Sequence, residues 1–150
     1  MITIIDINVL YVYKNKHYKV VKIMNVEVNS NGVNKLIKYN ILSDEEMRDI
    51  GFTDCSKDTW YFCRMIKFPK DKKEYRGFEI SFSVSIPKDN SDIRIDVLDE
   101  DFCQPYDYQY MLDKNPKFEP CLIVKEQVEE WMKYLQDNGV LSGHVYGEYI

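Results

Sequence analysis

The sequence predicts an α+β fold: a curved antiparallel sheet of about five to six strands with a C-terminal amphipathic helix packed on one face. Two observations support this class. Apolar residues recur at every second position through much of residues 2–97, which is typical of strands with one buried face. Residues 123–138 instead space their apolar side chains three and four apart, as an amphipathic helix does. With no repeat and no linker-like stretch, the chain 1–150 is predicted to be a single α+β domain.

The first forty residues predict a three-stranded meander. Its strands are expected over residues 2–13, 18–28 and 33–41, because apolar and β-branched residues alternate along each of them. Asn31-Gly32 marks the second turn, since this pair tolerates the positive φ angles of a tight hairpin. The lysines of this segment are expected on the exposed face or at an edge.

A short helix is expected from Asp44 to Ile50. Ser43 and Glu46 have the spacing of a capping box, in which each side chain bonds the other residue's backbone amide. Gly51 ends the helix, because glycine readily adopts a left-handed conformation. Residues 53–58 are polar and predict a loop.

The next two strands flank a charged turn. One is expected over residues 60–68 and ends at Pro69. The other, over residues 77–86, shows the strongest alternation in the chain and is expected to be central. Its buried face is predicted to hold Phe78, Ile80, Phe82, Val84 and Ile86. Its wet face is predicted to hold Ser81, Ser83 and Ser85.

The C-terminal third predicts one more short strand and two helices. The strand covers residues 93–97, and Pro105 is expected to open a short helix that reaches Leu112. The final helix is expected over residues 123–138, and residues 140–150 form either a last strand or an ordered wrap. The apolar stripe of that helix comprises Val124, Val128, Trp131, Met132 and Leu135.

Composition and charge narrow the function classes. The net charge of −5 disfavours nucleic acid as a partner, because phosphates would be repelled on average. The first ten residues make a poor signal peptide and no apolar stretch reaches membrane length, so a cytoplasmic protein with no membrane partner is expected. The four cysteines form no Cys-x-x-Cys pair and are expected to be reduced.

No catalytic or metal-binding signature is present. His17 and His144 lie far apart in the sequence and neither is near a cysteine pair, so no metal site, no cofactor and no catalytic residue is predicted. Both histidines are expected near solvent. Cys103 follows three acids, whose negative charge would raise the thiol pKa and disfavour a reactive thiolate. A basic run over residues 64–76 is interpreted as a well-solvated hairpin tip, and it is the one place where phosphate contact would be sought.

Acidic and aromatic side chains are most concentrated in residues 96–110, which hold five carboxylates and three tyrosines. Rigid aromatic rings beside clustered acids favour a contact surface for a basic protein. The predicted partner-binding residues are Asp99, Glu100, Asp101, Tyr106, Asp107 and Tyr108. The acids are expected to be exposed with Tyr108 beside them. In the alternative interpretation Phe102, Tyr106 and Tyr110 pack inward and only the acids are exposed.

These observations favour a non-enzymatic, cytoplasmic protein-binding domain of the inhibitor or immunity type, which masks a basic partner through this loop. One alternative is a small metal-assisted hydrolase that uses the carboxylates of residues 96–101. Another is a structural or oligomer-forming domain. Carboxylates that converge around a cavity would favour the hydrolase, whereas an acidic convex surface would favour the binding domain.

Overall fold

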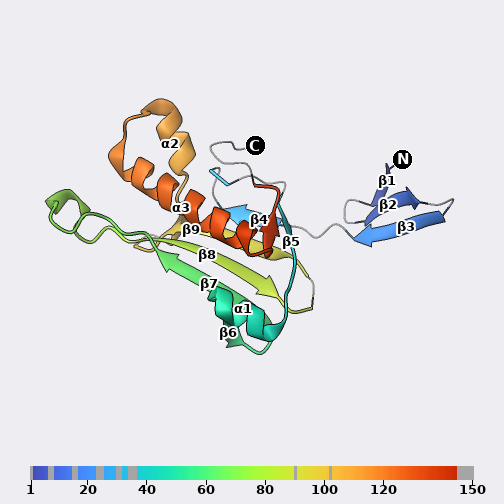
Figure 1. The fold of residues 1–150 in the computed structure, drawn as a ribbon. Coiled ribbons are helices and arrows are strands. Elements are labelled where there is room, and N and C mark those ends of the chain that lie inside the picture. The colour runs from blue at the N-terminus through green and yellow to red at the C-terminus, as the bar shows by residue number, and fades with distance from the viewer. Residues whose placement is uncertain are drawn as a thin grey trace.

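The computed structural model describes residues 2–6, 9–14, 17–22, 26–29, 32–33, 37–89, 91–101 and 103–144. It confirms the α+β class and the long C-terminal helix. The main sheet has six strands in the order β10-β9-β8-β7-β6, with β4 paired to the outer side of β9 (Figure 1). These strands are β4 (Val26–Asn29), β6 (Thr53–Ser56), β7 (Thr59–Met65), β8 (Ile80–Pro87), β9 (Ile93–Asp99) and β10 (Gln104–Pro105). The helices are α1 (Asp44–Ile50), α2 (Tyr108–Lys114) and α3 (Glu119–Asp137).

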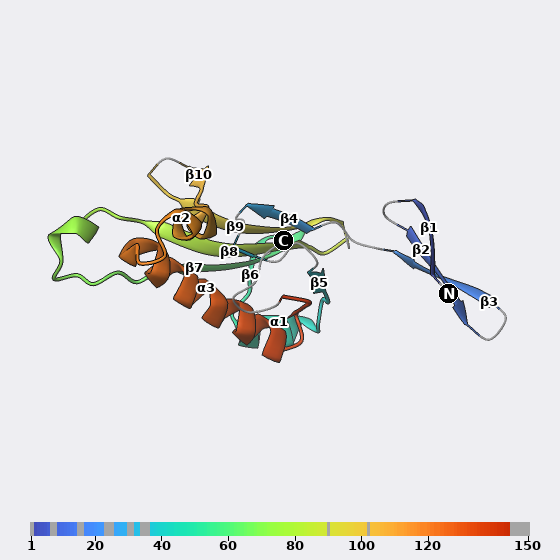
Figure 2. The same ribbon diagram turned by 90° about the horizontal axis from the view of Figure 1, so that it is seen from above.

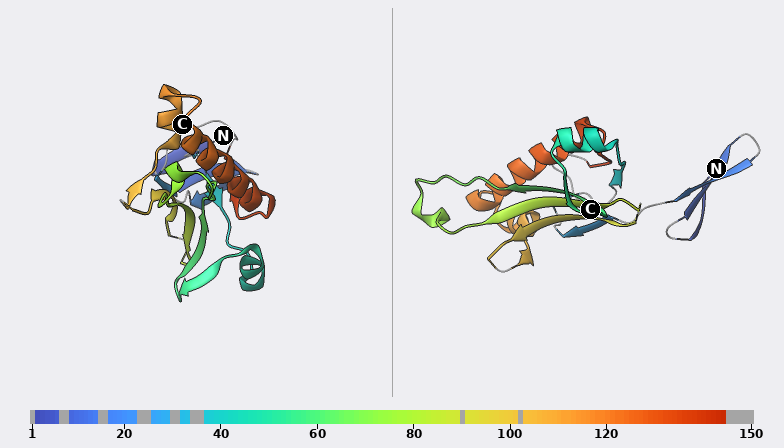
Figure 3. Two further views of the ribbon diagram at one scale, coloured as in Figure 1. Left: turned by 90° about the vertical axis from the view of Figure 1, so that its left-hand side faces the viewer. Right: turned by 90° about the horizontal axis from the view of Figure 1, so that it is seen from below.

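Strand β8 lies at the centre of the antiparallel order, as its alternation predicts. Ile80, Phe82, Val84 and Ile86 are all fully buried, and Phe78 is half-buried just before the strand begins. The same face receives α3, because the Trp131 and Phe62 rings meet with centroids 5.7 Å apart. Figure 3 shows α1 and α3 on one side of this sheet.

The expected wet face of β8 is only partly right. Ser81 and Ser83 lie on the side opposite α3, but their exposed fractions are 2% and 4%. Each serine is flanked across the sheet by a longer side chain, such as Met65 beside Ser81 and Asp96 beside Ser83. A small side chain between longer neighbours is shielded from water even where no helix covers it.

The predicted N-terminal meander is wrong in its pairing. The stretch expected as one strand folds back on itself, since β1 (Ile2–Asp6) pairs antiparallel with β2 (Val9–Lys14). A strand of residues 2–13 would exceed the usual length of about five to six residues. With β3 (His17–Lys22) these strands form a separate three-stranded sheet, drawn apart from the main sheet in Figure 2.

The expected hairpin at Asn31-Gly32 is also wrong. Strand β4 runs parallel to β9, and β5 (Lys38–Tyr39) pairs with β11 (Leu141–Ser142). Asn31 lies outside the described residues, and Gly32 is in a turn. A Cβ atom at Gly32 would lie 2.0 Å from Cζ of Tyr108, so this position requires glycine because a ring approaches the backbone closely.

The first helix matches its predicted bounds and caps, except that the Glu46 carboxylate accepts from the Ser43 hydroxyl where the capping box predicted the Ser43 amide. The Glu46 amide donates to Oγ of Ser43 at 3.2 Å, the Ser43 hydroxyl donates to Oε1 of Glu46 at 2.9 Å, and Gly51 has a φ of 118°. The loop expected at residues 53–58 is wrong in its first part, because Thr53–Ser56 form the edge strand β6. Its polar residues suit an edge that meets water on one side.

The C-terminal elements differ in their bounds. Pro105 lies in β10 rather than in a helix, and α2 begins at Tyr108. Proline is compatible with this short outer strand because it needs no ladder donor there. Helix α3 begins at Glu119, with Pro120 in its first turn. The tail contributes β11, and residues 145–150 lie outside the described residues.

Candidate recognition surface

The acidic loop after β9 places most of its carboxylates in water. Glu100, Asp101 and Asp107 are exposed as predicted, whereas Asp99 is half-buried. Asp99 is held by the loop itself, because the backbone amide of Asp101 donates to its Oδ1 at 3.0 Å. The hydroxyl of Ser81 donates to the Glu100 carboxylate. The loop therefore presents its charge while two of its acids fix its shape.

The aromatic part of the prediction is wrong for Tyr108. Its side chain is fully buried, because it packs over the backbone of Gly32. Tyr106 is buried as well, with its hydroxyl 3.4 Å from Sγ of Cys121. Burial, followed by that contact, raises the pKa of Tyr106 above its ordinary value. Tyr110 points outward with 53% of its surface exposed, so the inward alternative holds for Tyr106 and not for Tyr110. Phe102, the third residue of that alternative, lies outside the described residues.

The second face of the main sheet carries aromatic and apolar side chains that are open to solvent, which the loop was expected to supply through Tyr106 and Tyr108. We call it the open face, because no helix in the described part of the chain lies over it (Figure 3). Strand alternation places on it Tyr61, Cys63, Met65, Ser81, Ser83, Ser85, Arg94, Asp96 and Leu98. Met65 is 48% exposed, and Tyr61 and Leu98 are half-buried.

Polar contacts join the open face to the acidic loop. Asp96 accepts from Nε of Arg94 at 3.0 Å and lies opposite Ser83 on the neighbouring strand. Burial raises the pKa of Tyr61, and so do its contact with Cys63 and the nearby charge of Glu100. Glu100 thus belongs electrostatically to both the loop and the face. The result is a surface with tyrosine and methionine on β7 and carboxylates on β9 and in the loop that follows it.

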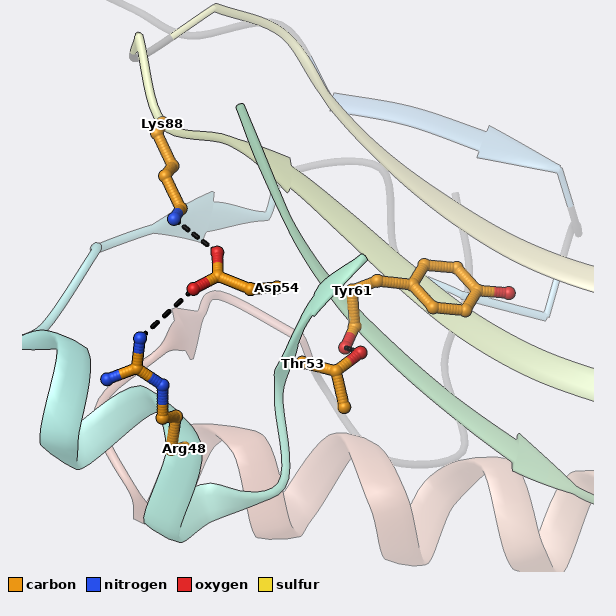
Figure 4. Close-up of polar contacts among 5 residues, drawn as sticks. All are labelled: Arg48, Thr53, Asp54, Tyr61 and Lys88. Atoms are coloured by element: carbon orange, nitrogen blue, oxygen red, sulfur yellow. Dashed lines mark hydrogen bonds and ion pairs between the residues drawn. The ribbon is translucent and has the colours of Figure 1, made fainter. Parts of the chain in front are cut away.

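The opposite edge of the sheet is closed by a separate cluster (Figure 4). Asp54 on β6 lies between Arg48 of α1, at 3.0 Å, and Lys88, which follows β8. Both cations also lie over the buried ring of Trp60, at 5.5 Å and 4.4 Å from its centroid. The hydrogen bond from Lys88, followed by that from Arg48, lowers the pKa of Asp54. Thr53 secures the same edge by donating to the Tyr61 carbonyl at 3.3 Å.

His144 differs from its expected place near solvent. It is buried, and its Nε2 lies 2.9 Å from Oε2 of Glu129 on α3. Its backbone amide donates to Oε1 of Gln136 at 2.9 Å, so the imidazole and the amide together hold residue 144 against α3. Within the described ranges, no three His, Cys, Asp or Glu side chains gather as metal ligands would. His17 lies in β3, and its side chain lies outside what the structure describes.

Two residues of this surface, Tyr61 and Met65, were missed from the sequence. A signal was present, because residues 60–63 are apolar on both faces of the strand rather than alternating. A strand of that kind is typical of a sheet with two functional or buried faces. The prediction used only the alternation set by Trp60 and Phe62, and it left the Tyr61 side unexamined.

No family model and no curated protein matches this chain. Among solved structures, the fold is similar to the crystal structure of a DUF1831 family protein, Lp2179, from Lactobacillus plantarum. The TM-score is 0.50 at 11% sequence identity, over 79% of this chain and 92% of that chain. The TM-score supports a shared fold, whereas a sequence identity this low carries no information about function. Of the helices that the structure describes, none has the length and apolar character needed to cross a bilayer.

Proposed function

We propose that this protein is a non-enzymatic binding domain that engages a basic protein partner through the open face and the adjoining acidic loop. The observation that carries the proposal is the contact between Ser81 and Glu100, which joins the two surfaces into one. Clustered acids steer a basic partner and speed its encounter, while an aromatic side chain provides binding energy.

Tyr61 takes the anchoring role that the sequence had suggested for Tyr108. Its ring is rigid and half-buried, and exposed Met65 lies two positions along the same face. Methionine adapts to an irregular partner surface because its side chain is flexible and polarizable. Glu100 contacts Ser81, which pairs with Met65 across the sheet, and exposed Asp101 follows Glu100 in the loop. Carboxylates therefore lie at one end of this apolar group, as charge does around an aromatic anchor.

The hydrolase alternative finds less support, because the carboxylates do not converge. Asp96 is engaged by Arg94, Asp99 by the amide of Asp101, and Glu100 by Ser81. Each acid is therefore held by a different group. A metal-assisted hydrolase needs several of them directed at one point.

Site-specific photo-cross-linking tests the proposal when it is carried out in the cells that naturally make this protein. A photoreactive phenylalanine analogue replaces Met65 on the open face or, as a matched control, Phe118 near the start of α3. These side chains are similarly exposed, at 48% and 40%, so solvent access alone does not distinguish them. The proposal predicts a discrete cross-linked basic protein from position 65 and none from position 118. Equal capture from both positions, or an acidic protein captured at position 65, would contradict it.

A further inference from the structure

The connection between β7 and β8 carries a second, oppositely charged site. It projects beyond the end of the main sheet (Figure 1) and includes the short helical turn η1, Lys73–Tyr75. A pocket of about 270 Å³ opens in it. Its apolar wall is formed by Phe68, Tyr75 and Phe78, and its rim carries Lys70, Lys72 and Arg76.

The aromatic wall is an ordered cluster. Phe68 stacks on Tyr75 with centroids 5.2 Å apart and an interplanar angle of 19°. Phe78 meets Phe68 edge-on at 4.9 Å, and Tyr106 of the core meets Phe78 edge-on at 6.2 Å. These contacts connect the pocket wall to the body of the protein. Ring pairs in such arrangements stabilise each other beyond simple burial of area.

Helix α3 holds this connection in place at two points. Gln127 bonds the backbone of Lys67 twice, accepting from its amide and donating to its carbonyl, each at 2.8 Å. Glu119 accepts from Nζ of Lys72 at 2.8 Å and from the Tyr75 hydroxyl at 3.0 Å. A site supported by side chains of a long helix is preorganised, which lowers the entropic cost of binding.

The rim cations fall into two groups. Lys72 is neutralised by Glu119, and this ion pair lowers the pKa of Glu119. For Lys70 and Arg76, no ion pair with a carboxylate is found in the part of the chain that the structure describes. Both side chains are exposed beside the aromatic wall. The pocket therefore combines an apolar surface with two cations that form no ion pair among the described residues, while Asp71 and Glu74 lie in the same connection and do not line the pocket.

We infer that this pocket binds a ligand with a single aromatic ring that bears an anionic group, either phosphate or carboxylate. The ring packs on Phe68 and Phe78, and the anion bonds Lys70 and Arg76. Arginine suits this role because its planar fork can donate two parallel hydrogen bonds to such an anion. The pocket lies just below the usual range for small-ligand sites, which is about 300–1,000 Å³, so it accommodates a one-ring group and not a larger one. The inference is independent of the open face and concerns different residues.

Titration followed by NMR chemical shifts tests the inference, with phenyl phosphate and benzoate as probes. Aromatic resonances of Phe68 and Phe78 are expected to shift on binding of at least one probe. Inorganic phosphate should bind at least about tenfold more weakly than phenyl phosphate, because it buries no ring. Toluene should bind at least about tenfold more weakly as well, because it lacks the charge-assisted hydrogen bonds. The stronger of the two anionic probes identifies which anionic group the pocket prefers.

Charge-removing variants complete the test. K70A/R76A is expected to weaken binding of the preferred probe by at least about tenfold, since hydrogen bonds to charged groups are lost. The matched control K67A/K73A removes two exposed cations of the same connection that do not line the pocket. It should change the affinity by no more than about twofold, because exposed charges that do not line the pocket are screened by water and salt. Equal losses in both variants, inorganic phosphate binding as tightly as phenyl phosphate, or no shift with either anionic probe would overturn the inference. None of these results depends on the open face.

Discussion

At the residue scale, Phe82 illustrates how one core side chain supports the sheet. It is fully buried in the central strand, and its ring meets Phe62 edge-on at 6.4 Å. Phe82→Ala should lower the free energy of unfolding by about 3–5 kcal/mol, because it removes buried area and leaves a cavity. Urea denaturation measures this loss. Phe118→Ala, at a site 40% exposed, serves as the control and should cost far less. A Phe82→Ala protein as stable as the control would refute the assigned core.

Gly32 makes a second residue-scale prediction. A methyl group there would lie 2.0 Å from the Tyr108 ring, so Gly32→Ala should destabilise the protein by about 1–3 kcal/mol through overpacking. In the double variant with Tyr108→Ala the two effects should not add, because removing the ring removes the clash. Thermal unfolding of the two single variants and the double variant measures this coupling. Strict additivity would show that Gly32 does not contact Tyr108.

At the scale of single elements, α1, β6 and the turn after β8 are joined by Asp54. Its pKa is lowered in the folded protein by Lys88 and then by Arg48, so the folded state binds a proton less readily than the unfolded chain. The resulting stabilisation is present above the ordinary aspartate pKa. It is lost as the pH falls through the lower, folded-state value.

The corresponding variant is Asp54→Asn. It should be less stable than the parent at neutral pH, and the difference should shrink as the solution is acidified through that range. Chemical denaturation at a series of pH values measures the trend. Asp58→Asn, at an exposed acid in the next turn, is the control. A stability difference that stays constant or grows toward acid pH would show that Asp54 is not stabilised by its two cations.

Local signals predicted some elements well, and tertiary contacts decided the others. The capping box and Gly51 defined α1, and alternation identified β8, because these features act over a few neighbouring residues. The pairing of β4 with β9 was not predictable, since it joins segments more than sixty positions apart. The Asn31-Gly32 signal misled for the same reason: Gly32 serves a distant ring.

The candidate site shows the same limit. Exposure of Glu100, Asp101 and Asp107 followed from their charge, because isolated carboxylates are costly to bury. The position of Tyr108 did not follow, since an amphipathic tyrosine can face either the core or water. The apolar run of residues 60–63 indicated a second face at Tyr61, but the neighbours of Tyr61 on that face followed only from the pairing of β7 with β8.

At the scale of the whole molecule, the two proposed sites differ in the sign of their net charge. The open face and its loop carry Asp96, Asp99, Glu100 and Asp101 against Arg94, whereas the β7–β8 connection carries Lys67, Lys70, Lys72, Lys73 and Arg76 against Asp71, Glu74 and Glu79. We propose a basic protein as the partner of the first region and an anionic, single-ring ligand for the second. The two proposals rest on different residues, so each is tested independently of the other.

The central claim is that a basic protein binds the acidic open face, and a titration with the protein captured at position 65 tests it most directly. Calorimetry at low and at physiological salt compares the parent with E100K/D101K and with the control E126K/E130K, which makes the same change in net charge on the exposed side of α3. The account predicts that E100K/D101K weakens binding by at least about tenfold at low salt and reduces the salt dependence. The control should keep the parent's affinity within about twofold, because its charges lie away from the interface. Equal affinities for the parent and E100K/D101K, or equal losses in both variants, would contradict the claim.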